Sequence, residues 1–213
     1  MSEYFLSVAT GFGPFRAPHG VACDFGAIWM EQGKGHVNGA PVGRGEGAFL
    51  RKNDTVDISP NDNSRWIRFD LSKKTPNWDE TPAPVLSVQI ETECSAVLLR
   101  LDEVKFPPGA VAYRHVHPGD GIRFLTLGEL EVIGDNHRET ARAGHAWYEA
   151  ANSPVRAVAS ETHPMTRFVR FMVLPVEYAG KPSIQVLDPD DAARPRRQIT
   201  HRHFDRIVQL DPG

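Results

Sequence analysis

The stretch GAVAYRHVHPGDGIRFLTLG, residues 109–128, decides how the rest of this chain is interpreted. Its two histidines, His115 and His117, lie two residues apart. On a β-strand this spacing places both side chains on one face of the sheet. Two imidazoles on one face can supply two ligands to a divalent metal ion. The stretch therefore predicts a strand, a Pro-Gly turn, a second apolar strand and a candidate metal site.

Turn-forming residues are frequent, with 17 prolines and 18 glycines in 213 residues. After residue 85 they separate short apolar stretches at intervals of about 8–12 residues, which is typical of β-sandwiches and barrels. The composition and the spacing together predict an all-β chain. The expected strands of this region are residues 87–92, 96–101, 111–117, 122–127, 130–133, 146–149, 154–159 and 167–174.

A polar, proline-rich connector at residues 73–84 separates the N-terminal region from these strands. The N-terminal region is rich in glycine, which disfavours helix and a large core of its own. Near the other end, Asp188 before Pro189 predicts the start of a short helix. We therefore expect a single domain over residues 1–213, composed of an N-terminal strand extension (1–84), a barrel (85–176) and a short C-terminal tail (177–213).

Charge and hydropathy exclude several classes of partner. The net charge is −3 with both signs mixed along the chain, which predicts no nucleic-acid partner. No apolar run approaches the ~20 residues of a membrane span, and the N-terminus does not resemble a signal peptide. Cys23 and Cys94 lie far apart, and we interpret them as two reduced thiols. These features favour a cytoplasmic protein without a membrane partner.

The stretch 109–128 resembles the first motif of the cupin superfamily, which is Gly, five residues, His-x-His, three or four residues, Glu, six residues and Gly. Gly109, His115, His117 and Gly128 fall in register, whereas Gly121 stands at the position of the glutamate. The second cupin motif, Gly, five residues, Pro-x-Gly, two residues, His, three residues and Asn, is matched only at its start. The residues at its five defining positions are Gly144, Ala150, Asn152, Val155 and Ala159.

This resemblance implies a cupin-type double-stranded β-helix, also called a jelly-roll barrel. Cupins hold a metal inside the barrel with three histidines and a glutamate, and this chain retains two of those four ligand positions. A divalent metal ion (Fe, Mn, Zn or Ni) is the implied cofactor, and absence of any metal is the alternative, because two ligands alone give a weak site. Cupins usually form dimers, often by exchanging N-terminal strands, so we also expect a homodimer.

Substitutes for the missing ligands can be sought on the strand before the second motif. His145, Trp147 and Glu149 share one face of that expected strand. If this face points inward, Glu149 or His145 reaches the metal, and two histidines with one carboxylate form a facial triad. The alternative places Glu149 at the barrel rim and His145 in solvent. His163 is a more distant candidate, with a turn histidine as the alternative.

Two further residues are candidates for a catalytic role. Arg123 lies two residues after Gly121, and the resemblance implies that this face points into the barrel, where a buried guanidinium requires a partner. That partner is either an internal carboxylate such as Glu149 or an anionic small-molecule ligand. The alternative, if the strand bulges, is that Arg123 is a surface residue. Tyr113 shares the expected face of His115 and would either donate a hydrogen bond to a ligand or pack in the core.

A second His-x-His pair, His201 and His203, lies in the arginine-rich tail without a surrounding cupin motif. We interpret it as a solvated strand face or a dimer contact, and a second metal site is the alternative.

Three functions remain open from the sequence. The first is a metal-dependent cupin enzyme, of the dioxygenase, isomerase or lyase type, that acts on a small carboxylate or phenolic substrate. The second is a non-catalytic cupin that binds a small molecule beside a degenerate metal site. The third is a structural or assembly module. Fold alone does not choose among them.

Overall fold

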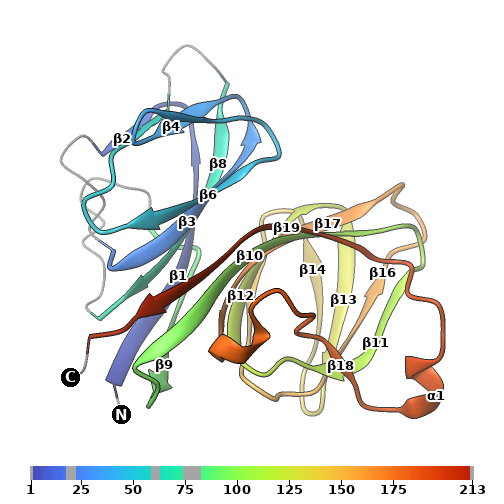
Figure 1. Cartoon of the computed structure of the whole chain (residues 1–213). Helices are drawn as coiled ribbons and strands as arrows, with labels where there is room; N and C mark the ends of the chain where they lie inside the picture. The colour runs from blue at the N-terminus through green and yellow to red at the C-terminus, as the bar shows by residue number, and fades with distance from the viewer. Residues whose placement is uncertain (1, 18–22, 59–62, 74–82, 212–213) are drawn as a thin grey trace. The chain divides into compact units, whose positions relative to one another are not determined.

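The computed structural model describes residues 2–17, 23–58, 63–73 and 83–211, so most of the proline-rich connector lies outside it. Nearly all regular structure in the described chain is antiparallel strand, which confirms the all-β prediction. It divides into two compact units (Figure 1). The first contains Met1–Cys94 and Asp211–Gly213, and the second contains Ser95–Leu210. No helix in the described ranges is long and apolar enough to cross a membrane.

The first unit is a sandwich of two sheets, with strand orders β6-β3-β8-β1-β9 and β2-β7-β4-β5. The residues that we expected to form an extension thus have a hydrophobic core of their own, which includes Phe15, Leu50 and Trp66. The strands are β1 (Ser2–Phe12), β2 (Phe15–Ala17), β3 (Phe25–Gln32), β4 (Gly35–Val37), β5 (Ala40–Val42), β6 (Gly47–Arg51), β7 (Val56–Ile58), β8 (Arg65–Ser72) and β9 (Leu86–Thr92).

The second unit is a barrel of two five-stranded sheets, ordered β15-β12-β17-β10-β19 and β14-β13-β16-β11-β18 (Figure 1). Its strands are β10 (Ala96–Phe106), β11 (Val111–Val116), β12 (Asp120–Leu127), β13 (Glu129–Gly134), β14 (Arg138–Arg142), β15 (Ala146–Glu149), β16 (Val155–Ala159), β17 (Thr166–Leu174), β18 (Gln185–Val186) and β19 (Ile199–Gln209). A 3₁₀ turn, η1 (Val176–Tyr178), and one helical turn, α1 (Pro189–Ala192), complete the unit.

Strand β16 shows why one wall of the barrel interior is apolar and built from small side chains. Val155, Ala157 and Ala159 are buried, and Arg156 between them is exposed, as a period of two requires. The buried residues are small, so this wall leaves space inside the barrel. They pack with larger side chains such as Phe106 and Phe168 in one hydrophobic cluster.

The C-terminal segment is an integral part of the barrel. Strand β18 pairs with β11 in one sheet, and β19 pairs with β10 along almost its whole length in the other. Residues 187–198 therefore run from one sheet to the other and include α1. The predicted start of this helix is confirmed, because the Asp188 carboxylate accepts a hydrogen bond of 2.8 Å from the backbone N–H of Asp190.

Candidate metal centre

His115 lies near the end of β11, whose alternation changes just before this residue. The pairing of β11 with β16 shifts register between Ala112 and His115, which marks a β-bulge. Because of this shift, Ala112 and His115 are both buried. The Nδ1 of His115 lies 2.6 Å from the carbonyl oxygen of Tyr113. A carbonyl only accepts, so Nδ1 carries the proton and the lone pair of Nε2 is available to a ligand.

His117 follows β11 and has the same tautomer. Its Nδ1 donates to the carbonyl of Ser183 at 3.1 Å, and its Nε2 lies 3.2 Å from Nη1 of Arg170. Arginine only donates, so Nε2 of His117 is an acceptor here. Burial lowers the pKa of both histidines, and the charges of Arg170 and Arg123 lower the pKa of His117 further. Both imidazoles are therefore neutral near pH 7, which is the form that binds metals.

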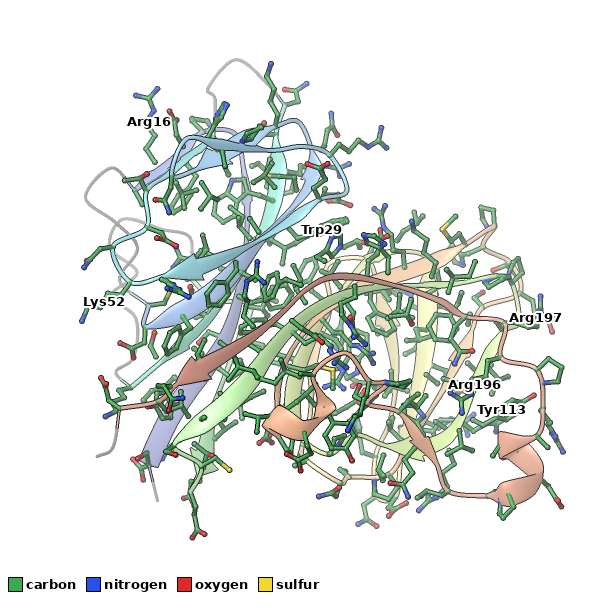
Figure 2. All side chains as sticks on the ribbon, viewed as in Figure 1. Arg16, Trp29, Lys52, Tyr113, Arg196 and Arg197 are labelled. Atoms are coloured by element: carbon green, nitrogen blue, oxygen red, sulfur yellow. The ribbon has the colours of Figure 1, made fainter. Side chains whose placement is uncertain are left out.

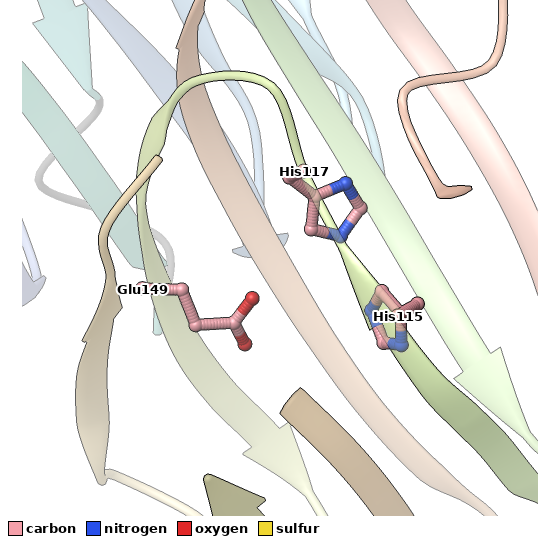
Figure 3. Close-up of side chains that lie close together, drawn as sticks. All are labelled: His115, His117 and Glu149. Carbon is pink, nitrogen blue, oxygen red and sulfur yellow. The ribbon is translucent and has the colours of Figure 1, made fainter. Parts of the chain in front are cut away.

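Glu149 supplies the carboxylate that the first motif lacks. It lies directly opposite Gly121 on the neighbouring strand, so its side chain reaches the space where the cupin glutamate is expected. Figure 3 shows the carboxylate pointing toward both imidazole rings. One ligand atom from each of His115, His117 and Glu149 lies within 4.8 Å of the other two. No other group of three such side chains occurs among the residues that the structure describes.

Arg123 occupies the space that Gly121 leaves. A Cβ at Gly121 would lie 2.6 Å from Nη1 of Arg123, so the glycine makes room for the guanidinium. Arg123 is 1% exposed, and its Nη2 lies 2.6 Å from Oε2 of Glu149. Burial lowers the pKa of Arg123 to about 10, against the opposing effect of Glu149, so the guanidinium stays charged near pH 7. Of the two expected partners of Arg123, the structure contains the internal carboxylate.

A cavity of about 130 Å³ lies beside this cluster. Its polar end contains His115, His117, Arg123, Glu149 and Arg170. Its apolar wall consists of aromatic and small aliphatic side chains: Val104, Phe106, Ala112, Leu130, Trp147, Val155, Ala157 and Phe168. The cavity can therefore receive a small molecule with one polar and one apolar end.

Two of the candidate residues lie elsewhere. The β-bulge before His115 breaks the strict alternation on which Tyr113 was predicted to share the histidine face, and the Tyr113 ring lies under the guanidinium of Arg194 at 5.5 Å. His145 precedes β15, and its Nε2 lies 2.8 Å from Oε2 of Glu139. The structure thus leaves Tyr113 and His145 outside the cluster and the cavity lining.

The remaining histidine candidates also lie outside the cluster. His163 is partly exposed, in a turn, 3.4 Å from the hydroxyl of Thr162, in agreement with the turn alternative. His201 and His203 have ring centroids 4.7 Å apart on β19. No third ligating side chain within the described ranges joins that pair to form a group of three.

Residues that the sequence did not single out orient the cluster. The indole Nε1 of Trp147 donates to Oε1 of Glu149 at 2.9 Å, and Arg170 contacts His117 while its Nε and Nη2 bind Asp102 at 3.1 and 2.9 Å. The carbonyl of Ser183, which accepts the hydrogen bond from His117, belongs to the C-terminal segment. Only Trp147 had a sequence signal, its spacing from Glu149, because the partners of Arg170 and Ser183 depend on tertiary structure.

The donor set suits a borderline divalent ion. Two neutral imidazoles and one carboxylate form the ligand set of a facial triad, and both histidines have the outer hydrogen bond that orients a metal-ligating imidazole. One contact competes, since Nη1 of Arg170 occupies the lone pair of His117. A metal ion on this lone pair would displace Nη1, and the whole planar guanidinium of Arg170 would shift on Asp102, which accepts from its Nε and Nη2. With that displacement the donor set fits a metal ion.

Fold and cluster together define the class of protein, a jelly-roll barrel with a histidine and carboxylate cluster inside. Residues 102–169 match the family model described as "Cupin domain". The second unit therefore contains a cupin domain. A comparison with curated proteins finds no match.

Solved structures with the same fold have low sequence identity to this chain. A point mutant of the oxalate decarboxylase of Bacillus subtilis is 12% identical over 89% of this chain and 73% of its own, with a TM-score of 0.60. AerE from Microcystis aeruginosa is 15% identical over 82% and 88%, with a TM-score of 0.52. A point mutant of the salicylate 1,2-dioxygenase of Pseudoaminobacter salicylatoxidans, in complex with gentisate, is 12% identical over 85% and 71%, with a TM-score of 0.53. These similarities concern the fold.

Proposed function

We propose that the second unit is a metal-dependent enzyme. His115, His117 and Glu149 hold one divalent ion, and a small carboxylate or phenolic substrate binds in the adjoining cavity. The reaction is an oxidation of the dioxygenase type, a lyase reaction or an isomerisation. The observation that carries this proposal is that backbone carbonyls fix both Nδ1 atoms, so both Nε2 atoms are free of protons beside one carboxylate.

When bound, the divalent ion supplies Lewis-acid or redox chemistry to the substrate. The residues of this chain position the ligands and shape the cavity. Trp147 and Arg123 fix the two oxygens of Glu149, and Arg123 also neutralises its charge. The apolar wall excludes water, which strengthens electrostatic interactions at the polar end. The substrate class is supported by two of the fold relatives, whose names specify oxalate and salicylate.

A second candidate function is a non-catalytic protein that binds a small molecule in the same cavity. The contact between Arg170 and His117 favours it, because a guanidinium on the lone pair of His117 satisfies that histidine without a metal. The two candidates differ in whether Arg170 releases His117.

Metal content decides between them. Protein purified without an affinity tag is incubated with Fe(II), Mn, Zn or Ni, desalted and analysed for bound metal. The proposed enzyme holds about one ion per chain, and His115→Ala removes it because the other two ligands alone bind weakly. His145→Ala is the matched control and retains the metal, since His145 pairs with Glu139 outside the cluster. A wild-type protein that retains none of the four metals contradicts the enzyme and leaves the non-catalytic candidate.

We also propose that the chain forms a homodimer. Ile199 and Ile207 are 64% and 54% exposed on β19, which is the edge strand of its sheet. Exposed apolar side chains on an edge strand are suited to a contact with another chain. Size-exclusion chromatography with light scattering measures the mass directly, and a monomer mass contradicts this proposal.

A further inference from the structure

The C-terminal segment around the connection from β18 to β19 lines part of the cavity. It crosses from one sheet of the barrel to the other, and four residues from this part of the chain line the cavity: Ile184, Arg196, Gln198 and Thr200. Arg196 is exposed and also lines the cavity, so its side chain lies at the entrance. Figure 2 labels it together with its neighbour Arg197, which does not line the cavity.

The arginines of the cavity differ in whether a carboxylate already binds them. Arg123 pairs with Glu149 at 2.6 Å, and Arg170 pairs with Asp102 at 2.9 Å. Arg196 has no acidic partner in the part of the chain that the structure describes. The two histidines are neutral, so Arg196 gives the cavity an excess positive charge. A guanidinium matches the geometry of a carboxylate and can bind it through two hydrogen bonds.

The apolar wall of the cavity determines what such a carboxylate is attached to. This wall contains Phe106, Trp147 and Phe168, with rings of neighbouring residues 5.3 to 6.0 Å apart. The volume of about 130 Å³ is slightly smaller than the engineered apolar cavity of about 150 Å³ that holds benzene. A single six-membered ring is therefore the largest apolar body that the cavity accommodates. A second negative charge at the apolar wall would face carbon atoms without a partner.

We propose that Arg196 binds the carboxylate of an aromatic monocarboxylic acid about the size of benzoate, whose ring lies against Phe106, Trp147 and Phe168. The inference rests on the proposed function for the place of the site, and it adds the substrate class and the residue that selects it. Arg123 does not take this role, because Glu149 already neutralises it inside the barrel.

Isothermal titration calorimetry with three probes tests the inference: benzoate, its neutral analogue benzyl alcohol, and the small dianion oxalate. Wild type binds benzoate more tightly than either of the others. Arg196→Gln weakens benzoate binding by about 10-fold or more, as expected for loss of a hydrogen-bonded charge pair. It leaves benzyl alcohol unchanged. Arg197→Gln is the matched control and changes benzoate binding less than about twofold, since it removes the same charge outside the cavity.

Several results would overturn the inference. They are no benzoate binding by wild type, equal effects of the two substitutions, or tighter binding of oxalate than of benzoate. Thermal unfolding of both variants verifies that they fold, which is expected because both side chains are exposed. Titrations with metal-loaded and chelator-treated protein separate this test from the proposed function. Binding of benzoate that depends on Arg196 but occurs in a protein unable to hold metal supports the inference and contradicts only the metal-dependent enzyme.

Discussion

The two units of this chain share one strand topology but differ in what fills their interiors. Adding nine to each strand number converts the order β6-β3-β8-β1 of the first unit into β15-β12-β17-β10 of the second. The same shift converts β2-β7-β4-β5 into β11-β16-β13-β14, the other sheet of the barrel written in reverse. The first unit therefore repeats the jelly-roll arrangement of the second, although the two halves of the sequence show no recognisable repeat.

Strand register aligns the two interiors residue by residue. In the first unit Gly26 lies opposite Leu50, and at the corresponding place in the second unit Gly121 lies opposite Glu149. The pair Ile28 and Arg68 corresponds in the same way to the pair Arg123 and Arg170. Leucine and isoleucine thus stand in the first unit where the second has its carboxylate ligand and the arginine that pairs with it.

The first unit fills the rest of its interior with aromatic rings. Phe15 and Trp66 have centroids 4.8 Å apart, and the guanidinium of Arg68 lies over Phe15 at 5.5 Å. Its buried carboxylate, Asp70, forms an ion pair of 2.9 Å with Arg68. The comparison teaches that one scaffold becomes a filled core or a candidate site through a few inward-facing residues. Exchanging those residues should convert one kind of interior into the other.

The largest effect is expected when Glu149 is replaced by the residue of the first unit. Glu149→Leu removes a ligand and leaves the buried Arg123 without its carboxylate, which costs about 3–5 kcal/mol of unfolding free energy. The double substitution Arg123→Ile with Glu149→Leu restores most of that stability, because no buried charge is left unpaired. Neither variant binds metal. Urea denaturation and metal analysis measure both effects, and a double variant as unstable as the single one would show that the register alignment is wrong.

The ion pair of the first unit provides the converse experiment. Asp70→Ala leaves the charge of Arg68 buried, and we expect a loss of about 3–5 kcal/mol in unfolding free energy. Metal content should stay at the wild-type value, because neither residue belongs to the cluster. Circular dichroism during denaturation and metal analysis measure these two quantities. Loss of metal from a folded Asp70→Ala variant would mean that the first unit takes part in the site.

The sequence predicted the barrel well because local patterns determine it. Turn residues at regular intervals and the His115–His117 spacing are both local, and the motif glycines Gly109 and Gly128 adopt positive φ values of 65° and 79° at turns. The pair of Arg123 and Glu149 was also within reach, since both lie on strands whose inward faces the motif sets. The shared topology of the two units was not predictable, because strand order depends on long-range pairing and leaves no local pattern.

The two errors at the site have different physical causes. Tyr113 was placed by strict alternation, and a register shift before His115 breaks that alternation. His145 does share the face of Trp147, on whose ring it stacks at 6.5 Å. It lies four residues from Glu149, however, about 13 Å along a strand, and pairs with Glu139 instead. Arg170 and Arg196 were missed for a different reason. Their roles depend on which acidic side chains lie nearby in space, and the sequence does not record that.

A smaller effect is expected at the paired glycines Gly26 and Gly121. A Cβ at Gly121 would approach Nη1 of Arg123 to 2.6 Å, and a side chain can move away from it. Gly121→Ala should therefore cost about 1–3 kcal/mol. A Cβ at Gly26 would approach the backbone oxygen of Phe69 to 2.4 Å, where only the backbone can move. Gly26→Ala should thus be the more destabilising of the two in urea denaturation, and the reverse order would contradict this account.

The last effect requires no substitution and is a pH dependence confined to the second unit. Burial holds the pKa of His115 and His117 below about 6.5, the value expected in the unfolded chain. Above pH 6.5 both histidines are neutral in either state, so they add no pH dependence. As the pH falls below about 6.5, the unfolded chain takes up protons first, and the free energy of unfolding drops by up to about 1.4 kcal/mol per pH unit for each histidine. The first unit buries no histidine among its described residues, so its unfolding should lack this slope.

Denaturation of chelator-treated protein between about pH 5 and pH 7.5 measures the dependence. His117→Gln should remove the larger share, because the nearby charges of Arg170 and Arg123 act on His117 most strongly. An unchanged slope in that variant would mean that other groups cause the acid sensitivity, and the two interiors would then not differ in their response to protons.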